Sequence, residues 1–274
     1  MKTITVKGFS STITSDPTLA VAVYGGEGSG KTEFSCTAPG VIGFIPLERK
    51  CRQTVYTARK KYGKTILLPD KDFIRVTNPI ALANLGPDKC SNPSRLTPPM
   101  CCAPHYYRAH VDSVKSALMD LYFTPGVDSL VIDSGTQLWE DMLMAHYGRT
   151  NRIMPLDRKP CNQEMIDLLN SLSGKNLVIT HRTAQVWKGN NPTDKVKLDG
   201  FGKIGFFVSA VVRCVNDEDK EEGEDGWFYM DIDMCQAKPS IAKTAGKKAL
   251  EDGGMTFANL AMLIFPDSDP EKWI

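Results

Sequence analysis

The stretch "VAVYGGEGSGKTEF", residues 21–34, contains the strongest structural signal in the sequence. It begins with small apolar and β-branched residues and turns abruptly into glycines, which predicts a short buried strand followed by a tight loop. The loop satisfies the spacing G-x-x-x-x-G-K-[ST], and a helix is expected from about Lys31. In such a loop the backbone N–H groups surround a β-phosphate, the lysine neutralises β and γ oxygens, and the hydroxyl ligates Mg²⁺. The motif therefore predicts a site for a nucleoside triphosphate and Mg²⁺. The residues expected at this site are Gly25, Gly26, Glu27, Gly28, Ser29, Gly30, Lys31, Thr32 and Glu33.

The rest of the chain alternates between strand-like and helix-like segments. Strands are expected at 19–24, 41–48, 73–76, 127–133 and 177–180, and helices at 110–123, 136–147 and 161–172. Such alternation with short connections predicts an α/β domain with a central, mostly parallel sheet flanked by helices. After residue 200, the β-rich runs 204–215 and 226–235 flank an acidic stretch that we interpret as a solvated hairpin loop. These late strands are expected to pair antiparallel at one side of the sheet.

Length and composition limit the classes of protein that this chain can be. Its 274 residues are interpreted as a single domain, 1–274, with a proline- and cysteine-rich loop insertion at about 84–108 and a C-terminal extension after about 245. With 33 Lys plus Arg against 32 Asp plus Glu, the net charge of +1 excludes binding of nucleic acid through bulk charge, so any contact must be a local patch.

The expected location follows from apolar runs and cysteines. No apolar run is long enough to span a membrane, so no membrane partner is expected. The eight cysteines have no regular spacing, and the N-terminus lacks the pattern of a secretory signal. A reduced, cytoplasmic compartment is therefore expected, which is the host cytoplasm if the protein is viral.

Two acidic residues that follow strands are candidates for metal binding and catalysis. A phosphate-binding loop needs a carboxylate at the end of a neighbouring strand, and Asp133 in "SLVIDS" has this position; the alternative is an aspartate that simply caps the next helix. Many ATPases place a water-activating glutamate directly after this aspartate, but here the next residue is Ser134. Glu48, which ends "VIGFIPLE", is therefore the predicted general base. The alternative is a surface glutamate paired with Arg49 or Lys50.

The layout "GGEGSGKTEF … FIPLERK … SLVIDSGTQLW … NLVITHR" resembles the RecA-like ATPases. More narrowly, it resembles the RecA-like nucleotide-binding proteins of bacteriophages, some of which act in single-strand annealing and recombination. The resemblance covers about residues 18–240. It implies that Glu48 activates the attacking water, and that Thr180 or His181 senses the γ-phosphate and relays its loss to DNA-binding loops. His181 is equally well explained as a structural histidine at a strand end.

The resemblance also implies action between subunits. In RecA-like ATPases a basic residue of a late strand reaches the γ-phosphate bound by a neighbour, and "DMCQAKPSIAK" makes Lys238 the first candidate. Ser240 stands where a second basic residue is often found in this family. Either Lys243 takes the place of that residue, or this chain has no second basic residue that reaches the neighbour's γ-phosphate. A solvated lysine is the alternative for each. A homo-oligomer, either a ring or a filament, is expected.

DNA-binding loops in this family follow the strands that border the γ-phosphate, which here gives segments 146–160 and 181–203. Trp187 and Phe201 add aromatic surfaces on which bases could stack, so single-stranded DNA bound without base readout is the expected partner. A polar surface loop of similar composition is the alternative. The basic residues of the two segments are Arg149, Arg152, Arg158, Lys159, Arg182, Lys188, Lys195, Lys197 and Lys203.

The insertion raises the question of a metal site. It holds Cys90, Cys101 and Cys102 near His105 and His110. The spacing C-x₁₀-C-C-x₂-H is not an established zinc pattern, and adjacent cysteines rarely both ligate one tetrahedral ion. Reduced cysteines in a loop are therefore expected.

The sequence as a whole predicts a RecA-like ATPase that hydrolyses ATP·Mg²⁺ and couples turnover to binding, annealing or recombination of single-stranded DNA. Two alternatives stay open. One is a nucleotide or small-molecule kinase with the same loop, although no arginine-rich lid segment occurs. The other is a non-hydrolysing assembly or loader protein for which ATP is a switch. A GTPase is disfavoured because the chain has no N-K-x-D tetrad.

Overall fold

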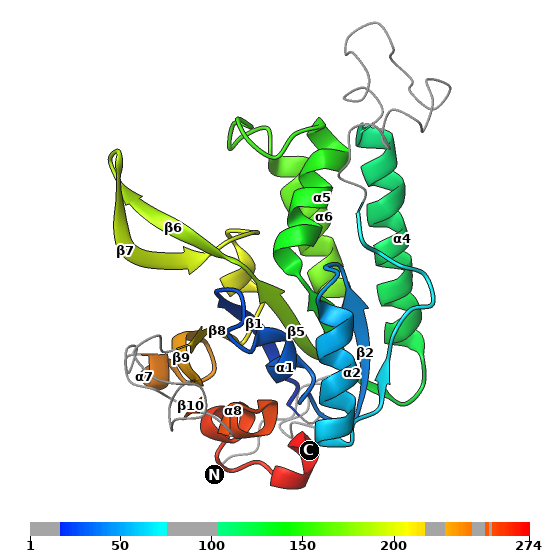
Figure 1. Ribbon diagram of the computed structural model, residues 1–274, viewed down its shortest axis with the longest axis vertical. Coiled ribbons are helices and arrows are strands. Elements are labelled where there is room, and N and C mark those ends of the chain that lie inside the picture. Colours follow the sequence, from blue (N-terminus) through cyan, green and yellow to red (C-terminus); the bar gives the residue numbers. More distant parts are fainter. Residues whose placement is uncertain (1–16, 76–102, 217–227, 243–249, 252–253) are drawn as a thin grey trace, which may run out of the picture.

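The computed structural model describes residues 17–75, 103–216, 228–242, 250–251 and 254–274, and a sheet forms its centre (Figure 1). Eight strands of this described part pair in the order β10-β9-β8-β1-β5-β4-β2-β3. β1 is parallel to β5 and β8, and β2 is parallel to β3 and β4, whereas β9 is antiparallel to β8 and β10 to β9. The predicted α/β class, a central and mostly parallel sheet with late antiparallel strands, is thereby confirmed. The strands are β1 (Ala20–Gly25), β2 (Val41–Pro46), β3 (Ile66–Leu67), β4 (Val127–Asp133), β5 (Asn176–His181), β8 (Ala210–Asn216), β9 (Phe228–Cys235) and β10 (Leu250–Glu251).

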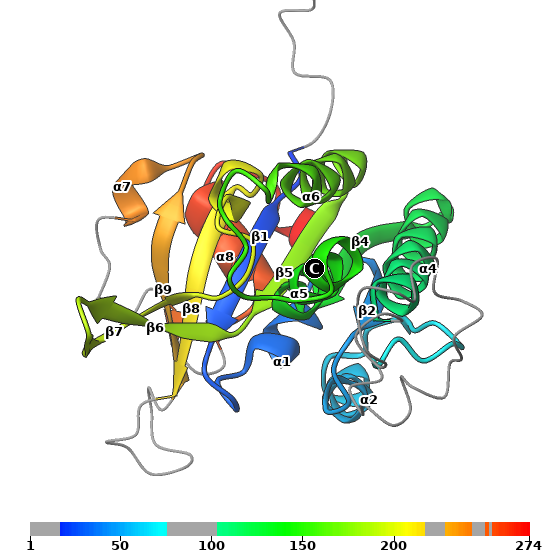
Figure 2. The same ribbon diagram turned by 90° about the horizontal axis from the view of Figure 1, so that it is seen from above.

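Helices cover both faces of the sheet (Figure 2). Strands buried on both faces need apolar residues at successive positions, and β1 has them: Ala22 packs with the first helix layer, whereas Val21 and Val23 pack with the second. The first layer is α4 (Ala103–Phe123), α5 (Gly135–Tyr147) and α6 (Lys159–Ser171). The second layer is α1 (Lys31–Ser35), α2 (Cys51–Tyr62) and α8 (Phe257–Ile264).

The C-terminal segment supports the helix that follows the phosphate-binding loop. Thr256 caps α8 by accepting a hydrogen bond from the Asn259 N–H. Trp273, in the 3₁₀ helix η4 (Pro270–Trp273), is fully buried and packs on Phe257 of α8. Phe257 in turn lies against Phe34 of α1, with ring centroids 6.3 Å apart. α1 is therefore braced by residues at the far end of the chain.

A second, two-stranded antiparallel sheet consists of β6 (Thr183–Lys188) and β7 (Asn191–Leu198). This hairpin projects from the body of the molecule, as Figure 1 shows. Its turn contains Gly189, whose φ of +65° lies in the left-handed region that favours glycine. Most of the segment 181–203, predicted as a loop, is thus an ordered hairpin. The β-branched residues on both sides of a Gly-Asn turn were the signal for it.

The strand predicted at 73–76 is wrong. Residues 73–75 are not in a strand, and Val76 lies outside the described residues. Phe73 is buried in the first helix layer, and Arg75 binds the carboxylates of Glu140 and Asp141 in α5. Side-chain contacts rather than a hydrogen-bonded ladder therefore hold this segment, and the edge strand is β3 instead.

The predicted boundary between the loop insertion and the following helix is also wrong. α4 begins at Ala103, so residues 103–108 are helical, while the rest of the insertion lies outside the described residues. Tyr107 is buried and continues the helical spacing of Val111, Val114 and Leu118 toward the N-terminus. The burial of Tyr107 explains why the helix starts earlier than the sequence indicated.

The late β-rich run 204–215 becomes a strand only at Ala210. Its first residues form the 3₁₀ helix η2 (Ile204–Phe206), and a short helix α7 (Pro239–Ala242) follows β9. The acidic stretch between β8 and β9 lies outside the described residues beyond Asn216. Among the helices of the described residues, none combines the length and the apolar character needed to cross a membrane.

Candidate active site

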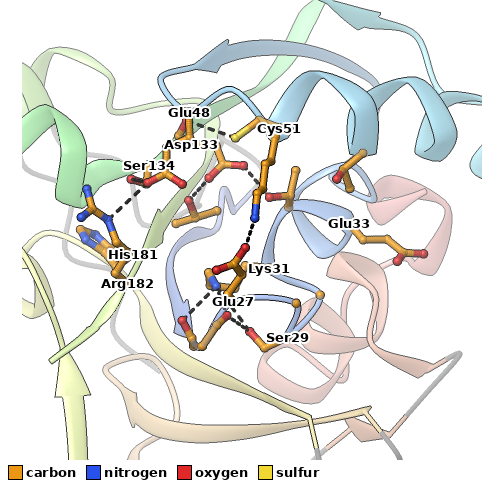
Figure 3. A pocket seen from close by; sticks show the side chains of 18 of the residues that line it. Glu27, Ser29, Lys31, Glu33, Glu48, Cys51, Asp133, Ser134, His181 and Arg182 are labelled. Carbon is orange, nitrogen blue, oxygen red and sulfur yellow. Dashed lines mark hydrogen bonds and ion pairs between the residues drawn. The ribbon is translucent and has the colours of Figure 1, made fainter. Parts of the chain in front are cut away.

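A cleft opens at the edge of the sheet where the parallel strands end. β1, β2, β4 and β5 all end at this edge, the position at which open α/β sheets bind ligands. The cleft has a volume of about 820 Å³ (Figure 3). The whole predicted phosphate-binding stretch, residues 25–33, lines it together with Glu48, Asp133, Thr180 and His181. The fold thus brings together the predicted nucleotide-site residues from four strand ends.

The loop between β1 and α1 has a backbone that its glycines permit. A Cβ atom at Gly25 would lie 2.3 Å from the carbonyl oxygen of Cys214 and 2.4 Å from Ser29 Oγ, so no larger residue fits there. Gly30, which precedes α1, has a φ of +83°. Ser29 Oγ donates a 2.9 Å hydrogen bond to the Gly26 carbonyl. The loop is therefore held in one form by its own residues.

Lys31 lies over this loop. Its Nζ donates to the Gly25 carbonyl at 2.9 Å, to the Gly26 carbonyl, and to Ser29 Oγ at 3.4 Å. Burial lowers the pKa of Lys31, because the charged ammonium is less well solvated in the cleft than in water. Phosphate oxygens at the loop would give this ammonium a charged hydrogen-bond partner.

Asp133 lies between the two threonine hydroxyls at the position where a metal ion would bind. Its buried carboxylate accepts hydrogen bonds from Thr32 Oγ1, at 2.7 Å, and from Thr180 Oγ1. Burial raises the pKa of Asp133, and the two hydroxyl donors oppose the rise. A hydroxyl and a carboxylate this close are the hard oxygen donors that Mg²⁺ prefers. The residues present therefore fit a magnesium ion that Thr32 would ligate and Asp133 would support.

Glu48 lies two residues beyond the end of β2, which stops at Pro46 rather than at Glu48 as predicted. Its Oε1 accepts a 2.7 Å hydrogen bond from Ser134 Oγ and lies 3.4 Å from Arg182 Nε (Figure 3). Within the described residues, no hydrogen bond or ion pair involves Oε2. One carboxylate oxygen of Glu48 is thus held in place while the other is available to a water molecule.

The surface pairing considered for Glu48 is not present. Among the described residues, no ion pair joins Glu48 to Arg49 or Lys50; Lys50 pairs instead with Glu27, and both of those side chains are exposed.

The carboxylate of Glu33 points away from the cleft in Figure 3 and binds Lys61 of α2 at 2.6 Å. Exposed pairs of this kind contribute little to stability.

The two predicted sensor residues have different surroundings. Thr180 donates to Asp133 and so contacts the group that would support the metal. His181 is fully buried; its Nδ1 lies 3.1 Å from the Asp199 carbonyl oxygen and 3.4 Å from Thr136 Oγ1. Burial lowers the pKa of His181 to about 4, so the ring is neutral at pH 7. Thr180 therefore faces the phosphate side of the site, and His181 faces the base of the hairpin.

Lys238 lies away from the cleft. It follows β9, and its Nζ donates a 3.2 Å hydrogen bond to the carbonyl of Leu263 in α8. Lys238 is not among the residues that line the cleft, so a catalytic role would require the cleft of another subunit. Ser240 is exposed beside it, and Lys243 lies outside the described residues.

Most of the basic residues predicted to bind DNA are exposed, but Arg158 is half-buried and donates to the Ile153 carbonyl, and Arg182 lies inside the cleft. The Trp187 side chain is 60% exposed on the hairpin. Arg182 lies in the cleft, where it approaches Glu48 and Glu140. The exposed basic residues are Arg149 and Arg152 between α5 and α6, Lys159 at the start of α6, Lys188, Lys195 and Lys197 on the hairpin, and Lys203 after β7.

The prediction that Phe201 is a stacking surface for bases is wrong. Its side chain is only 1% exposed and packs against Trp139 of α5, with ring centroids 5.2 Å apart. Phe201 thus belongs to the core beneath the end of the hairpin. The sequence could not distinguish it from Trp187, since both are aromatic residues near lysines and glycines.

No zinc site is found in the described residues, where no three His, Cys, Asp or Glu side chains form a group able to hold a metal. Cys90, Cys101 and Cys102 lie outside the described residues, so the prediction for them stays a prediction. The described cysteines are free and buried: Cys36, Cys51, Cys161, Cys214 and Cys235.

Sequence reasoning missed the roles of Ser134 and Thr136. Ser134 donates to Glu48 and also caps α5 by accepting a hydrogen bond from the Gln137 N–H. The signal was present, because Ser134 and Gln137 have the spacing S-x-x-Q of a capping box. Thr136 Oγ1 donates a 2.6 Å hydrogen bond to the carbonyl of Asp199. The two residues are far apart in the sequence, so no local pattern could indicate this contact.

Comparisons with known proteins give likenesses only among solved structures. No protein-family model and no curated protein matches this chain. Among solved structures, the chain is similar to the flagellar accessory protein FlaH from Methanocaldococcus jannaschii, with a TM-score of 0.35 and 10% sequence identity over 78% of this chain and 77% of that chain. Function is therefore inferred from the geometry of the cleft itself.

Proposed function

We propose that this protein is a RecA-like ATPase that hydrolyses ATP·Mg²⁺ and couples the reaction to single-stranded DNA. The observation that carries the proposal is the meeting of four side chains in one cleft. Lys31 and Thr32 begin the helix after the loop, Asp133 Oδ2 lies 2.7 Å from Thr32 Oγ1, and Glu48 follows the end of β2. The first three suffice to bind a metal-bound triphosphate, and Glu48 adds a group that can take a proton from water.

Each of the four side chains has a separate role in the proposed hydrolysis. A magnesium ion, when bound, neutralises phosphate charge. Lys31 neutralises β and γ oxygens, and Asp133 orients the Thr32 hydroxyl. Glu48 directs Oε2 at the attacking water and accepts its proton as the water oxygen bonds to the γ-phosphorus. The bond to the bridging oxygen breaks at the same time, and ADP and phosphate leave.

The hairpin β6–β7 is the proposed surface for single-stranded DNA. It carries the exposed Trp187 and the exposed Lys188, Lys195 and Lys197. Stacking of bases on an aromatic ring, with lysines beside it for the phosphates, binds single strands without reading their sequence. β6 follows directly on the cleft residues at the end of β5, so DNA at the hairpin would lie next to the nucleotide site. This arrangement supports a role in annealing or recombination of the kind found among phage RecA-like proteins.

The proposal extends to a ring or filament of identical subunits. Lys238 lies outside its own cleft, and so it can act in catalysis only on the nucleotide of a neighbour. A basic group that reaches across an interface toward the γ-phosphate stabilises the charge of the transition state.

The destination of the γ-phosphate tests the proposal. ATP labelled on the γ-phosphate is incubated with the protein and Mg²⁺, alone, with single-stranded DNA, and with nucleosides, nucleotides and sugars as acceptors. Release of labelled inorganic phosphate that increases with DNA is the expected result. Label on a small-molecule acceptor would identify a kinase, and binding of ATP without release of phosphate would identify an ATP-switched assembly protein.

A further inference from the structure

Arg182 belongs to two parts of the molecule at once. Its side chain lies in the cleft, where Nε is 3.4 Å from Glu48 Oε1 and Nη2 donates to Gln137 Oε1 at 3.3 Å. Its backbone belongs to the base of the hairpin, because β6 begins at the next residue, Thr183. One residue therefore contacts the proposed general base and also connects to the proposed DNA-binding hairpin.

The base of the hairpin is fastened to α5. The Arg182 carbonyl accepts a 2.9 Å hydrogen bond from the Asp199 N–H, which joins the two ends of the hairpin. The Arg182 N–H donates to Thr136 Oγ1 at 3.0 Å, and Thr136 Oγ1 donates to the Asp199 carbonyl at 2.6 Å. A change in the direction of the hairpin would thus be transmitted to the backbone of Arg182 rather than absorbed by a loose connection.

The guanidinium of Arg182 lies between two carboxylates at equal distances. Glu48 and Glu140 are each 3.4 Å from it, and the Glu140 carboxylate is shared with Arg75, whose Nη2 lies 2.8 Å away. Arg182 Nε is buried and has no hydrogen-bond partner within the described residues. Nη2 donates a hydrogen bond to Glu140 Oε2, whereas the contact with Glu48 is an ion pair without a hydrogen bond. The guanidinium is therefore not fixed by a bidentate pair with either carboxylate, and a small rotation would strengthen or weaken its contact with Glu48.

We propose that Arg182 is a positioning residue through which the hairpin controls Glu48. A single strand bound along the hairpin alters the contact between Arg182 and Glu48, and hydrolysis changes because Oε2 of Glu48 changes its position relative to water. Nucleotide affinity is unaffected, since the contacts of Lys31 and Thr32 do not pass through Arg182. This inference rests on the proposed function and adds a route by which DNA regulates turnover.

The test compares the wild-type protein with Arg182→Ala, Arg182→Lys and the control Arg59→Ala in the last turn of α2. Four quantities are measured for each: kcat, KM for ATP, DNA affinity, and the ratio of kcat with and without single-stranded DNA. For Arg182→Ala we expect kcat to fall roughly tenfold to a hundredfold while KM and DNA affinity stay within about twofold. The stimulation by DNA should fall to about one. Arg59→Ala should behave as the wild type does.

The lysine variant distinguishes positioning from a general loss of structure. Lysine restores the charge next to Glu48 but lacks the planar fork that also reaches Gln137 and Glu140, so kcat and DNA stimulation should recover in part. If Arg182→Ala does not fold, Arg182→Lys alone carries the test, with reduced stimulation at unchanged DNA affinity as the expected result.

Several results would overturn the inference. Undiminished DNA stimulation in Arg182→Ala would show that the hairpin does not act through this residue. A loss of DNA affinity that accounts for the lower rate would make Arg182 a DNA ligand instead. A wild-type protein that hydrolyses ATP without any response to DNA would also exclude the inference while leaving the ATPase intact. A wild-type protein that hydrolyses no ATP would refute the proposed function itself.

Discussion

The cleft and the β6–β7 hairpin are neighbours in the sequence, because β5 ends at the cleft and β6 begins two residues later. They differ in burial: several polar side chains of the cleft are buried, whereas those of the hairpin are largely exposed. In the cleft, Asp133 and Thr180 are buried and joined by a hydrogen bond, and the atoms around Gly25 leave no room for a larger side chain. On the hairpin, Trp187 is 60% exposed in a separate two-stranded sheet. The proposed nucleotide site is thus held in one shape, as catalysis would require, whereas the proposed DNA surface would be open to any single strand.

The largest expected effect is in the cleft. Lys31→Ala should reduce ATP hydrolysis by ~10³-fold or more, because the charge that neutralises the β and γ oxygens is lost. Phosphate release in the steady state measures it, with the exposed Lys60→Ala of α2 as a matched lysine control. Unchanged turnover in Lys31→Ala would show that the cleft is not the site of hydrolysis.

The second-largest expected effect distinguishes ATP binding from ATP hydrolysis in the cleft. Glu48→Gln should retain ATP affinity but lower turnover by about 10²- to 10⁴-fold, since an amide cannot accept the proton of water. A fluorescent ATP analogue measures binding and phosphate release measures turnover, with the exposed Glu271→Gln as the control. Equal losses of binding and turnover would assign Glu48 a structural role.

The hairpin should respond to mutation in the opposite way. Trp187→Ala should weaken binding of single-stranded DNA by about 1–3 kcal/mol for each base that stacks on the ring, and should leave hydrolysis without DNA unchanged. Fluorescence anisotropy of a labelled oligonucleotide measures this affinity. Tyr56→Ala is the matched control, because Tyr56 is 55% exposed on α2. If both aromatic variants bind DNA as the wild type does, the hairpin is not the DNA surface.

The smallest expected effect lies in the helix layer that supports both regions. Glu164 of α6 binds Arg108 at 2.6 Å, His146 at 2.6 Å and Lys115 at 3.1 Å. Burial alone would raise the pKa of Glu164, but the hydrogen bonds from these three residues outweigh it and lower the pKa to about 2. A carboxyl whose pKa falls on folding stabilises the protein fully above its ordinary value of 4.5, and that stabilisation is lost as the pH falls from there toward 2.

Glu164→Gln should therefore lower the free energy of unfolding at pH 7 by about 1–3 kcal/mol, with a weaker dependence on pH between about 5 and 2. Urea unfolding at several pH values measures both quantities, and Asp120→Asn, at an exposed position of α4, is the control. An identical acid dependence in the wild type and Glu164→Gln would show that this cluster does not contribute.

The same contrast explains what the sequence could predict. The phosphate-binding loop, Asp133 and Glu48 follow from the order of strands and the residues at their ends, because parallel strands bring those ends to one edge. These residues were predicted, and the structure places them in one cleft. Ser134 as the partner of Glu48 was visible only as a helix cap, since nothing local indicates which side chain its hydroxyl will meet.

The hairpin and its neighbours were harder to predict because exposure depends on tertiary packing. Trp187 and Phe201 look alike in sequence, but one is exposed and the other is buried against Trp139. Arg182 was grouped with the basic surface residues, and its guanidinium lies in the cleft beside Glu48. Both differences depend on how the hairpin meets α5, a contact between segments far apart in the chain.

The rate of ATP hydrolysis with and without single-stranded DNA shows whether the cleft hydrolyses ATP and whether the hairpin couples that hydrolysis to DNA. The purified protein is assayed for phosphate release at saturating ATP and Mg²⁺ while a single-stranded oligonucleotide is titrated, with the same sequence as a duplex for comparison. We expect hydrolysis to rise with the single strand and to saturate, and Glu48→Gln to reduce it by about 10²- to 10⁴-fold. No phosphate release under either condition, or a rate indifferent to the single strand, would contradict this expectation.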